Sequence, residues 1–256
     1  MEWTDSGLRE TYLPMALVWI GFVTFFVVAL AVGVRLALLW KRTGEWPELM
    51  IATGVLGIGV FGFGLQTAAA VAGEGTLLSR VLLALALIGS SVGTAAYYFF
   101  NAWVYHPESR GVRGLAIFGC AGLALAFVAT GLDTGFGRLG GTGPIDITRF
   151  LMLIGGMLWG SGEAFRYWLM MQRRLELGLA DPVVTNRFLL WSLGAGTAGL
   201  GSLIGMIAQL STGLTMLELP WVMASSSAHG FVAAIALWLA FVPPAGYVRY
   251  LRARAA

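Results

Sequence analysis

The sequence predicts an all-α integral membrane protein, a bundle of seven transmembrane helices. First, 58% of the residues are hydrophobic and only 11% are charged, whereas a soluble domain carries about 25% charged residues. Second, apolar runs long enough to cross a bilayer recur throughout. Third, basic residues gather on alternate connections between these runs, as the positive-inside rule requires. Residues 1–256 are therefore predicted to form one membrane domain, with no room for a soluble catalytic domain.

The seven predicted spans follow one another with short connections. They cover residues 13–40, 47–71, 77–105, 112–132, 146–172, 183–210 and 220–247. The first apolar run is too long for a cleaved signal peptide, so it is predicted to be an uncleaved span. Pro47 is placed to start the second span, and Pro243 and Pro244 are expected to break or kink the seventh.

The distribution of basic residues predicts the orientation of the bundle. The flanks of one side hold twelve: Arg35, Lys41, Arg42, Arg110, Arg113, Arg166, Arg173, Arg174, Arg187, Arg249, Arg252 and Arg254. The other side holds four: Arg9, Arg80, Arg138 and Arg149. This bias predicts an outside N-terminus and a cytoplasmic C-terminus. Because the basic residues flank membrane spans, the net charge of +3 does not indicate a nucleic-acid partner.

The origin of the chain is also indicated by its composition. Arginine outnumbers lysine fifteen to one, and alanine, glycine and leucine are abundant. This usage is typical of a GC-rich bacterial genome and favours a multi-pass protein of the bacterial inner membrane.

Glu163 is the only acidic residue that lies well inside a long apolar run. A carboxylate there is costly, so it is expected to face the bundle interior and is a functional-site candidate. It lies about eight residues, or roughly 12 Å, from the cytoplasmic end of its span, and Tyr98 or Asn101 are its expected neighbours. Arg166, three residues on, shares its helix face. The pair is either a structural ion pair or part of a proton or ion relay.

Other polar residues within the spans are candidates for a ligand site or ion pathway. Thr94, Tyr97 and Asn101 share one face of the third span, and Gln66 is an expected inner polar group of the second. His229 follows Ser225 and Ser226, and it is either a hydrogen-bonded core histidine or a protonation switch. The full set of candidates is Glu163, Arg166, His229, Ser225, Ser226, Tyr97, Tyr98, Asn101, Thr94 and Gln66.

No cofactor, metal or catalytic residue is predicted. The two histidines lie at different depths, His106 near the cytoplasmic end of the third span and His229 in the outer half of the seventh. A separation of about 15–20 Å prevents them from sharing a metal or haem. No nucleophile elbow or Ser-His-Asp set is apparent, and the single Cys120 allows no intramolecular disulfide.

Two short segments resemble known seven-helix families. Residues 225–231 resemble the seventh helix of microbial rhodopsins around its retinal lysine, which places His229 at the position of that lysine. Residues 244–247 resemble the Pro-x-x-Tyr end of the seventh helix in G-protein-coupled receptors. These resemblances imply a shared topology. The only lysine, Lys41, is predicted in a cytoplasmic turn, so no retinal Schiff base is expected in the core.

The sequence therefore favours a non-enzymatic sensor or receptor-like bundle. It would bind a small or lipidic ligand between its third, fifth, sixth and seventh helices. An alternative is a transporter or proton-linked channel that uses Glu163 and His229. A membrane enzyme without a recognisable motif is a second alternative. The expected partners are the lipid bilayer, such a ligand and a second copy in a homo-oligomer.

The predicted orientation can be tested with reporters fused after Ala256. A C-terminal green fluorescent protein should fluoresce and a C-terminal alkaline phosphatase should be inactive, because twelve of the sixteen basic residues lie on the predicted cytoplasmic side. An active phosphatase fusion would contradict this orientation.

Overall fold

The computed structural model describes residues 5–138, 141–214 and 218–255, and side chains from residue 18 onward. Within these ranges the regular structure is helical, with no strand. Its helices are α1 (Asp5–Thr43), α2 (Trp46–Val55), η1 (Leu56–Gly64), α3 (Leu65–Ala72), α4 (Leu77–Phe100), η2 (Asn101–Tyr105), α5 (Arg110–Thr134), α6 (Pro144–Glu176), α7 (Pro182–Thr212), α8 (Pro220–Phe241) and α9 (Ala245–Ala255). The segments η1 and η2 are π-helical and continue the α-helices before them.

Six of the described helical segments are long and apolar enough to cross a membrane. They cover Val18–Thr43, Trp46–Ala72, Leu77–Tyr105, Arg110–Thr134, Pro182–Thr212 and Pro220–Phe241. The prediction of a polytopic, all-helical membrane protein is thus supported by length and composition. Helix α6 has 33 residues but carries charged residues along its length, and it is not among the six. The count of seven spans remains a prediction.

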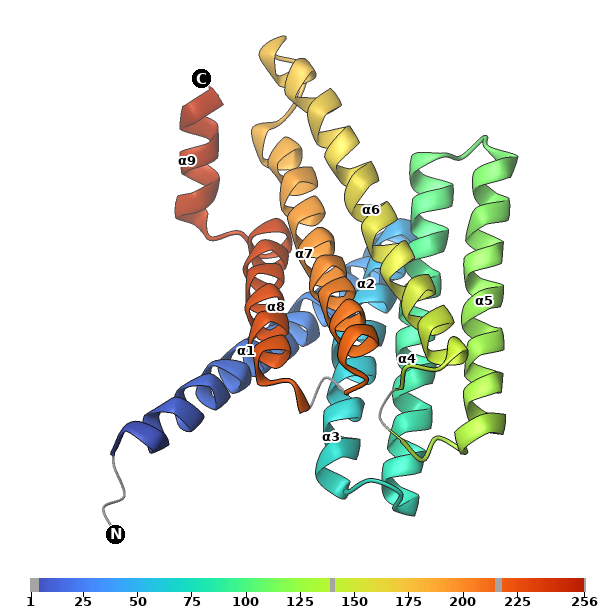
Figure 1. The fold of residues 1–256 in the computed structure, drawn as a ribbon. Coiled ribbons are helices and arrows are strands. Elements are labelled where there is room, and N and C mark those ends of the chain that lie inside the picture. The colour runs from blue at the N-terminus through green and yellow to red at the C-terminus, as the bar shows by residue number, and fades with distance from the viewer. Residues whose placement is uncertain (1–4, 139–140, 215–217, 256) are drawn as a thin grey trace.

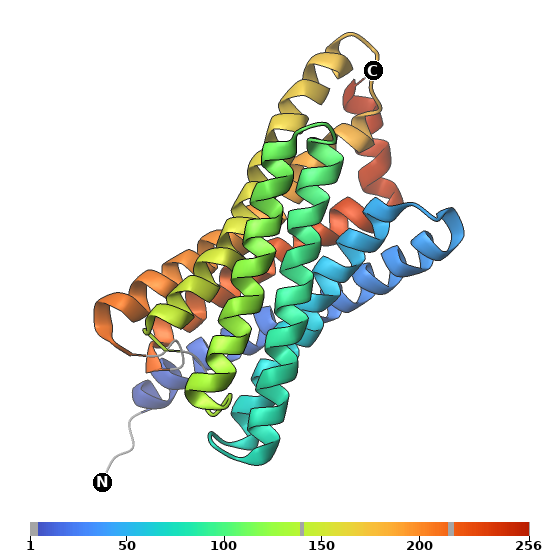
Figure 2. The ribbon, with the colours of Figure 1, turned by 90° about the vertical axis from the view of Figure 1, so that its right-hand side faces the viewer.

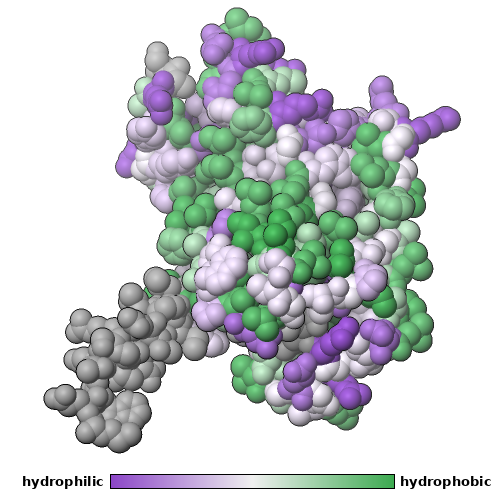
Figure 3. All heavy atoms as spheres, viewed as in Figure 1, coloured by the Kyte–Doolittle hydropathy of each residue, from purple (hydrophilic) through white to green (hydrophobic). Residues whose placement is uncertain are grey.

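Helices α1, α2, α4, α6, α7 and α8 follow one another around a ring, and α5 packs outside this ring against α4 and α6 (Figures 1 and 2). Helix α7 packs between α6 and α8, α8 packs on α1, and α1 packs on α2 and η1. Helix α4 contacts α2, η1 and α3 on one side and α5 and α6 on the other. Apolar residues form a belt across the middle of the molecule, with polar residues toward its two ends (Figure 3). The far ends of α6 and α9 project at the end of the bundle opposite the start of α1 (Figure 1).

The outer faces of the helices suit a hydrocarbon solvent. On α4, Val81, Leu85, Ile88 and Val92 are exposed, and their spacing of four, three and four residues puts them on one stripe. The interior combines larger apolar side chains with many alanines and with polar residues such as Thr94 and Asn101. In lipid this arrangement is expected, since apolar side chains gain nothing from leaving a membrane for a protein core.

The second span differs from the α-helix that the sequence predicts, because its middle is the π-helical segment η1. Gly57 of this segment rests directly on the backbone of α4. A Cβ added to Gly57 would lie 2.6 Å from the Gly89 carbonyl oxygen and 2.7 Å from Gly93 Cα. Glycines in a membrane span are typical of close helix contact, but they do not distinguish π- from α-helical hydrogen bonding. Such π-segments are frequently found at functional sites.

Two predicted ends are corrected by the structure. The seventh span ends at Phe241 rather than at 247, because Pro243 and Pro244 interrupt the helix before α9 begins. Helix α6 extends to Glu176, past the predicted end at residue 172. Other helix ends lie within a few residues of those predicted, except that α1 begins earlier, at Asp5.

The contact between η1 and α4 can be tested with a pair of glycine substitutions. Gly57→Ala should lower the thermal unfolding temperature of the detergent-purified protein, because the added methyl group forces two backbones apart at a cost of about 1–3 kcal/mol. Gly162→Ala is the matched control, since nothing lies within 4 Å of its Cβ position. The control should be neutral or stabilising by up to about 1 kcal/mol. Equal effects of the two substitutions would contradict the close contact.

Candidate functional site: a central cavity and an ion-pair cluster

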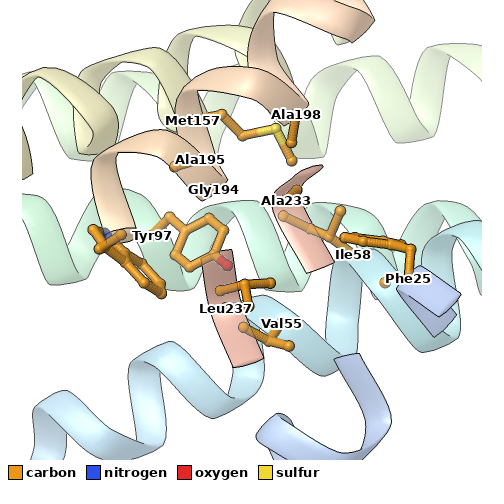
Figure 4. Close-up of a pocket in the computed structure, with 12 residues that line it drawn as sticks. Phe25, Val55, Ile58, Tyr97, Met157, Gly194, Ala195, Ala198, Ala233 and Leu237 are labelled. Atoms are coloured by element: carbon orange, nitrogen blue, oxygen red, sulfur yellow. The ribbon is translucent and has the colours of Figure 1, made fainter. Parts of the chain in front are cut away.

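A cavity of about 40 Å³ lies in the centre of the bundle, where α1, α2, η1, α4, α6, α7 and α8 meet (Figure 4). Its walls are mainly apolar. The lining residues are Phe25, Val55, Ile58, Gly59, Tyr97, Met157, Trp191, Gly194, Ala195, Ala198, Ala233 and Leu237. A cavity of this size holds a few water molecules, each of which needs about 10–15 Å³.

Tyr97 supplies the hydroxyl group of this cavity. Its ring forms part of the wall, and its oxygen points into the space between Val55, Gly194 and Leu237 (Figure 4). Gly54 makes room for the ring, because a Cβ there would lie 2.3 Å from a Tyr97 ring carbon. The hydroxyl makes no hydrogen bond with any other described residue, so it is available to a molecule in the cavity.

Trp191 forms part of the same wall. It is 7% exposed, and its ring meets Tyr97 edge-on with centroids 5.7 Å apart. It also lines an adjoining cavity of about 10 Å³ beside Asn101 and Gly160. Its indole Nε1 is buried without an acceptor among the described residues, so Trp191 contributes an aromatic surface to the wall and Tyr97 contributes the hydroxyl.

The face of α4 beside Tyr97 holds α6 in place. The Tyr98 hydroxyl donates to the Met152 carbonyl oxygen at 2.7 Å, and the Asn101 amide donates to the Gly156 carbonyl oxygen at 3.4 Å. A Cβ on Gly156 would come within 3.0 Å of Thr94 Cγ2. The stripe of glycines on α6 therefore admits α4, and these predicted site residues serve the contact between the two helices.

Glu163 lies in a cluster of polar side chains where η2 ends against α6. One carboxylate oxygen is 2.6 Å from His106 Nε2 and accepts a hydrogen bond from Trp159 Nε1 at 3.4 Å. The other accepts from Arg166 Nε at 3.0 Å. The side chain of Glu163 is 14% exposed and that of Arg166 is 60% exposed. The cluster thus joins a partly buried carboxylate to a basic residue of its own helix and a histidine of a distant one.

This geometry corrects the sequence prediction for Glu163. Its partner outside α6 is His106, and the expected neighbours Tyr98 and Asn101 bond to carbonyl groups nearer the start of α6. His106 follows the last turn of the third span, so Glu163 lies level with the end of that span, although α6 itself runs on to Glu176. The sequence did offer a signal for the contact between Glu163 and His106, because both residues precede connections on the predicted cytoplasmic side.

His229 lies on the other side of the cavity and belongs to the core. Its Nδ1 is 2.7 Å from the carbonyl oxygen of Ser225 and 3.5 Å from the Ser225 hydroxyl. It packs on α7 at Gly201, where a Cβ would lie 3.0 Å from His229 Cβ. It stands one turn from Ala233, which lines the cavity. Ser226 is half-buried in the same helix.

Gln66 is the predicted site residue that the structure places away from the others. It is exposed on α3, so it is not the inner polar group that the sequence suggested. Its neighbours Leu65 and Thr67 are half-buried. The actual contribution of the second span to the cavity comes from Val55, Ile58 and Gly59, whose apolar character gave no sequence signal.

The chain is thus a polytopic helical membrane protein with a small central cavity. An ion-pair cluster lies where η2, the last part of the third span, ends against α6. In the comparisons with known proteins, no family model, curated protein or solved structure matches it.

The role of the cluster can be tested with a double-mutant cycle on Glu163 and His106. Glu163→Gln and His106→Gln should each lower the thermal unfolding temperature, because each removes a partner from a partly buried pair. The double variant should lose less free energy of unfolding than the two single variants together. The difference, which is the coupling energy of the pair, should be about 0.5–3 kcal/mol. Arg166→Gln should have a smaller effect, since its side chain is largely exposed. Additive losses would contradict a direct interaction between Glu163 and His106.

Proposed function

We propose that this protein is an intramembrane sensor of the bacterial inner membrane. In this proposal α6 is the seventh span, the N-terminus is outside and the C-terminus is cytoplasmic. A small ligand enters the central cavity and changes the arrangement of the helices that line it. The receptor-like interpretation of the sequence is supported by one observation above all: a cavity lies at the junction of seven helical segments, and the Tyr97 hydroxyl points into it.

The small size of the cavity links binding to movement. An apolar cavity that takes up benzene measures about 150 Å³, whereas this one measures about 40 Å³. A ligand larger than a few waters therefore fits only a conformation in which the walls have separated. Such a ligand shifts the population toward that conformation. One wall is the π-helical segment η1, whose hydrogen-bonding pattern can change to α-helical, which gives the wall a way to move.

The helices that line the cavity also reach the cytoplasmic end. Met157 touches the cavity and lies about 9 Å along α6 from Glu163, which binds His106. Helix α6 then continues to Glu176. Leu237 of α8 lines the cavity one turn before the proline break that leads to α9. The Tyr247 hydroxyl of α9 accepts a hydrogen bond from Asn186 of α7 at 2.7 Å. Displacement of the cavity walls would thus be carried to three neighbouring cytoplasmic segments.

A second candidate function is proton-linked transport. It is favoured by titratable groups on both sides of the cavity: His229 toward the outer side, and Glu163 with His106 toward the cytoplasm. The sensor and the transporter differ in whether protons cross the membrane through the protein. Proteoliposomes with an internal pH dye should show no protein-dependent proton movement if the protein is a sensor. A flux abolished by Glu163→Gln would favour the transporter.

Ligand-linked movement can be tested with spin labels at the cytoplasmic ends of α6 and α9. In a Cys120→Ser background, labels on Arg174→Cys and Arg252→Cys should show a changed distance distribution when methylcyclohexane is added. Ala195→Leu fills the cavity and should abolish the change. Ala124→Leu adds the same group on the exposed face of α5 and should leave it intact. A change that persists in the cavity-filled variant would reflect partition into the detergent or lipid and would overturn the proposal.

A further inference from the structure

We propose that helix α9 is a docking surface for anionic phospholipid headgroups, in the leaflet where α8 leaves the membrane. The partner is a phosphate-bearing lipid with a net negative charge, such as phosphatidylglycerol. This inference goes beyond the sensor function and does not depend on any ligand of the central cavity. It comes from the position of α9, the side that it turns to α7 and the charges that it exposes.

Helix α9 begins close to the membrane surface. Helix α8 ends at Phe241 and α9 begins at Ala245, at the edge of the bundle (Figure 1). Trp238, three residues before the end of α8, is 38% exposed, and such a tryptophan is typical of the headgroup level. With 11 residues, α9 is about 16 Å long. The headgroup layer is about 5–8 Å thick on each side of a bilayer, so long basic side chains on α9 can reach it.

One side of α9 is held against the bundle. Tyr247, Val248 and Leu251 are half-buried, and α9 packs on α7. The Tyr247 hydroxyl accepts a hydrogen bond from the Asn186 amide of α7 at 2.7 Å. These contacts use the apolar side of α9, so the opposite side faces away from the bundle.

That opposite side is basic and has no counter-charge among the described residues. Arg249 and Arg252 are three residues apart, share a helix face and are exposed. Neither side chain forms an ion pair or hydrogen bond with any described residue, and no acidic residue follows Glu218 in the sequence. Tyr250 is 56% exposed beside this pair, and Arg254 donates to its hydroxyl at 3.4 Å.

The charge and position of this face select a lipid phosphate. Like charges three residues apart weaken a helix, and an anion bound between the two guanidinium groups would remove their repulsion. Guanidinium groups bind phosphate oxygens with paired hydrogen bonds, and lipid phosphates are the anions that surround a helix at this level. Each basic residue near the surface strengthens attraction to anionic lipid about fivefold. The positive-inside rule accounts for arginines on this side of the membrane, but it does not require them to share one exposed face.

The test compares two lipids at one labelled site. The full-length protein carries Cys120→Ser and Ala253→Cys, with a bimane fluorophore on the new thiol at an exposed position of α9. It is reconstituted in phosphatidylcholine nanodiscs that contain a small fraction of spin-labelled phosphatidylglycerol or spin-labelled phosphatidylcholine. The labelled phosphatidylglycerol should quench the fluorophore several times more strongly. Raising the salt from about 0.1 M to about 1 M should remove most of the difference, because the screening length falls from about 10 Å to about 3 Å.

Two double variants with the same change of charge assign this lipid preference to α9. Arg249→Gln with Arg252→Gln should bring the quenching ratio of the two lipids close to one. Arg173→Gln with Arg174→Gln removes two exposed charges from α6 at the same end of the bundle and should leave the ratio intact. Arg249→Lys with Arg252→Lys keeps the charge and should retain most of the preference. The thermal unfolding temperature should be unchanged throughout, because only exposed side chains are replaced.

Competitors distinguish a lipid headgroup from other anions. Free glycerol phosphate at millimolar concentration should not displace the lipid, because a headgroup held in the membrane has a high effective concentration. Displacement by glycerol phosphate would indicate a site for a soluble anion. Displacement by polyglutamate or a short DNA duplex at an equal concentration of charge would indicate a soluble partner, and either result would overturn the proposal. Equal quenching by the two lipids, or an equal loss of preference in the α6 and α9 glutamine variants, would also overturn it.

Discussion

The structure depends on close approach of backbones in a solvent that gives helices no hydrophobic reason to associate. In lipid, packing and hydrogen bonds hold helices together, and glycine permits the shortest distances. The contact of Gly57 with Gly89 and Gly93 joins η1 to α4 in this way. The opposite side of α4 meets α6 through Tyr98 and the glycine at position 156. Helix α4 thus contacts η1 on one side and α6 on the other, and it holds these two parts of the bundle together.

The central cavity is a consequence of this arrangement. Glycine and alanine let the helices approach closely, but the rings of Tyr97 and Trp191 are too large to interdigitate fully between them. The space that remains is mostly apolar, with the Tyr97 hydroxyl as the polar group that points into it.

The ion-pair cluster around Glu163 has a different character. Glu163 is bound from three directions, by His106, Trp159 and Arg166, and this set of bonds joins η2 to α6 just where both helices leave the bundle. Fully engaged groups of this kind are better suited to holding two helices in register than to binding a diffusing ligand. If the cavity is the receiving site, the cluster is a point at which movement of α6 would be passed to η2. The chemical site and the mechanical site are therefore separate.

Hydropathy and proline or glycine positions were enough to predict the helical class, the membrane and most helix ends, because these properties depend on residues that are neighbours in the chain. The sequence could not show that His106, rather than Tyr98 or Asn101, would meet Glu163, nor that Gln66 would be exposed. It also could not show that Tyr97 and Trp191 would share a cavity. Such pairings depend on the register and rotation of helices far apart in the chain, and a shift of one turn, about 5.4 Å, exchanges one partner for another. The tertiary structure alone decides that register.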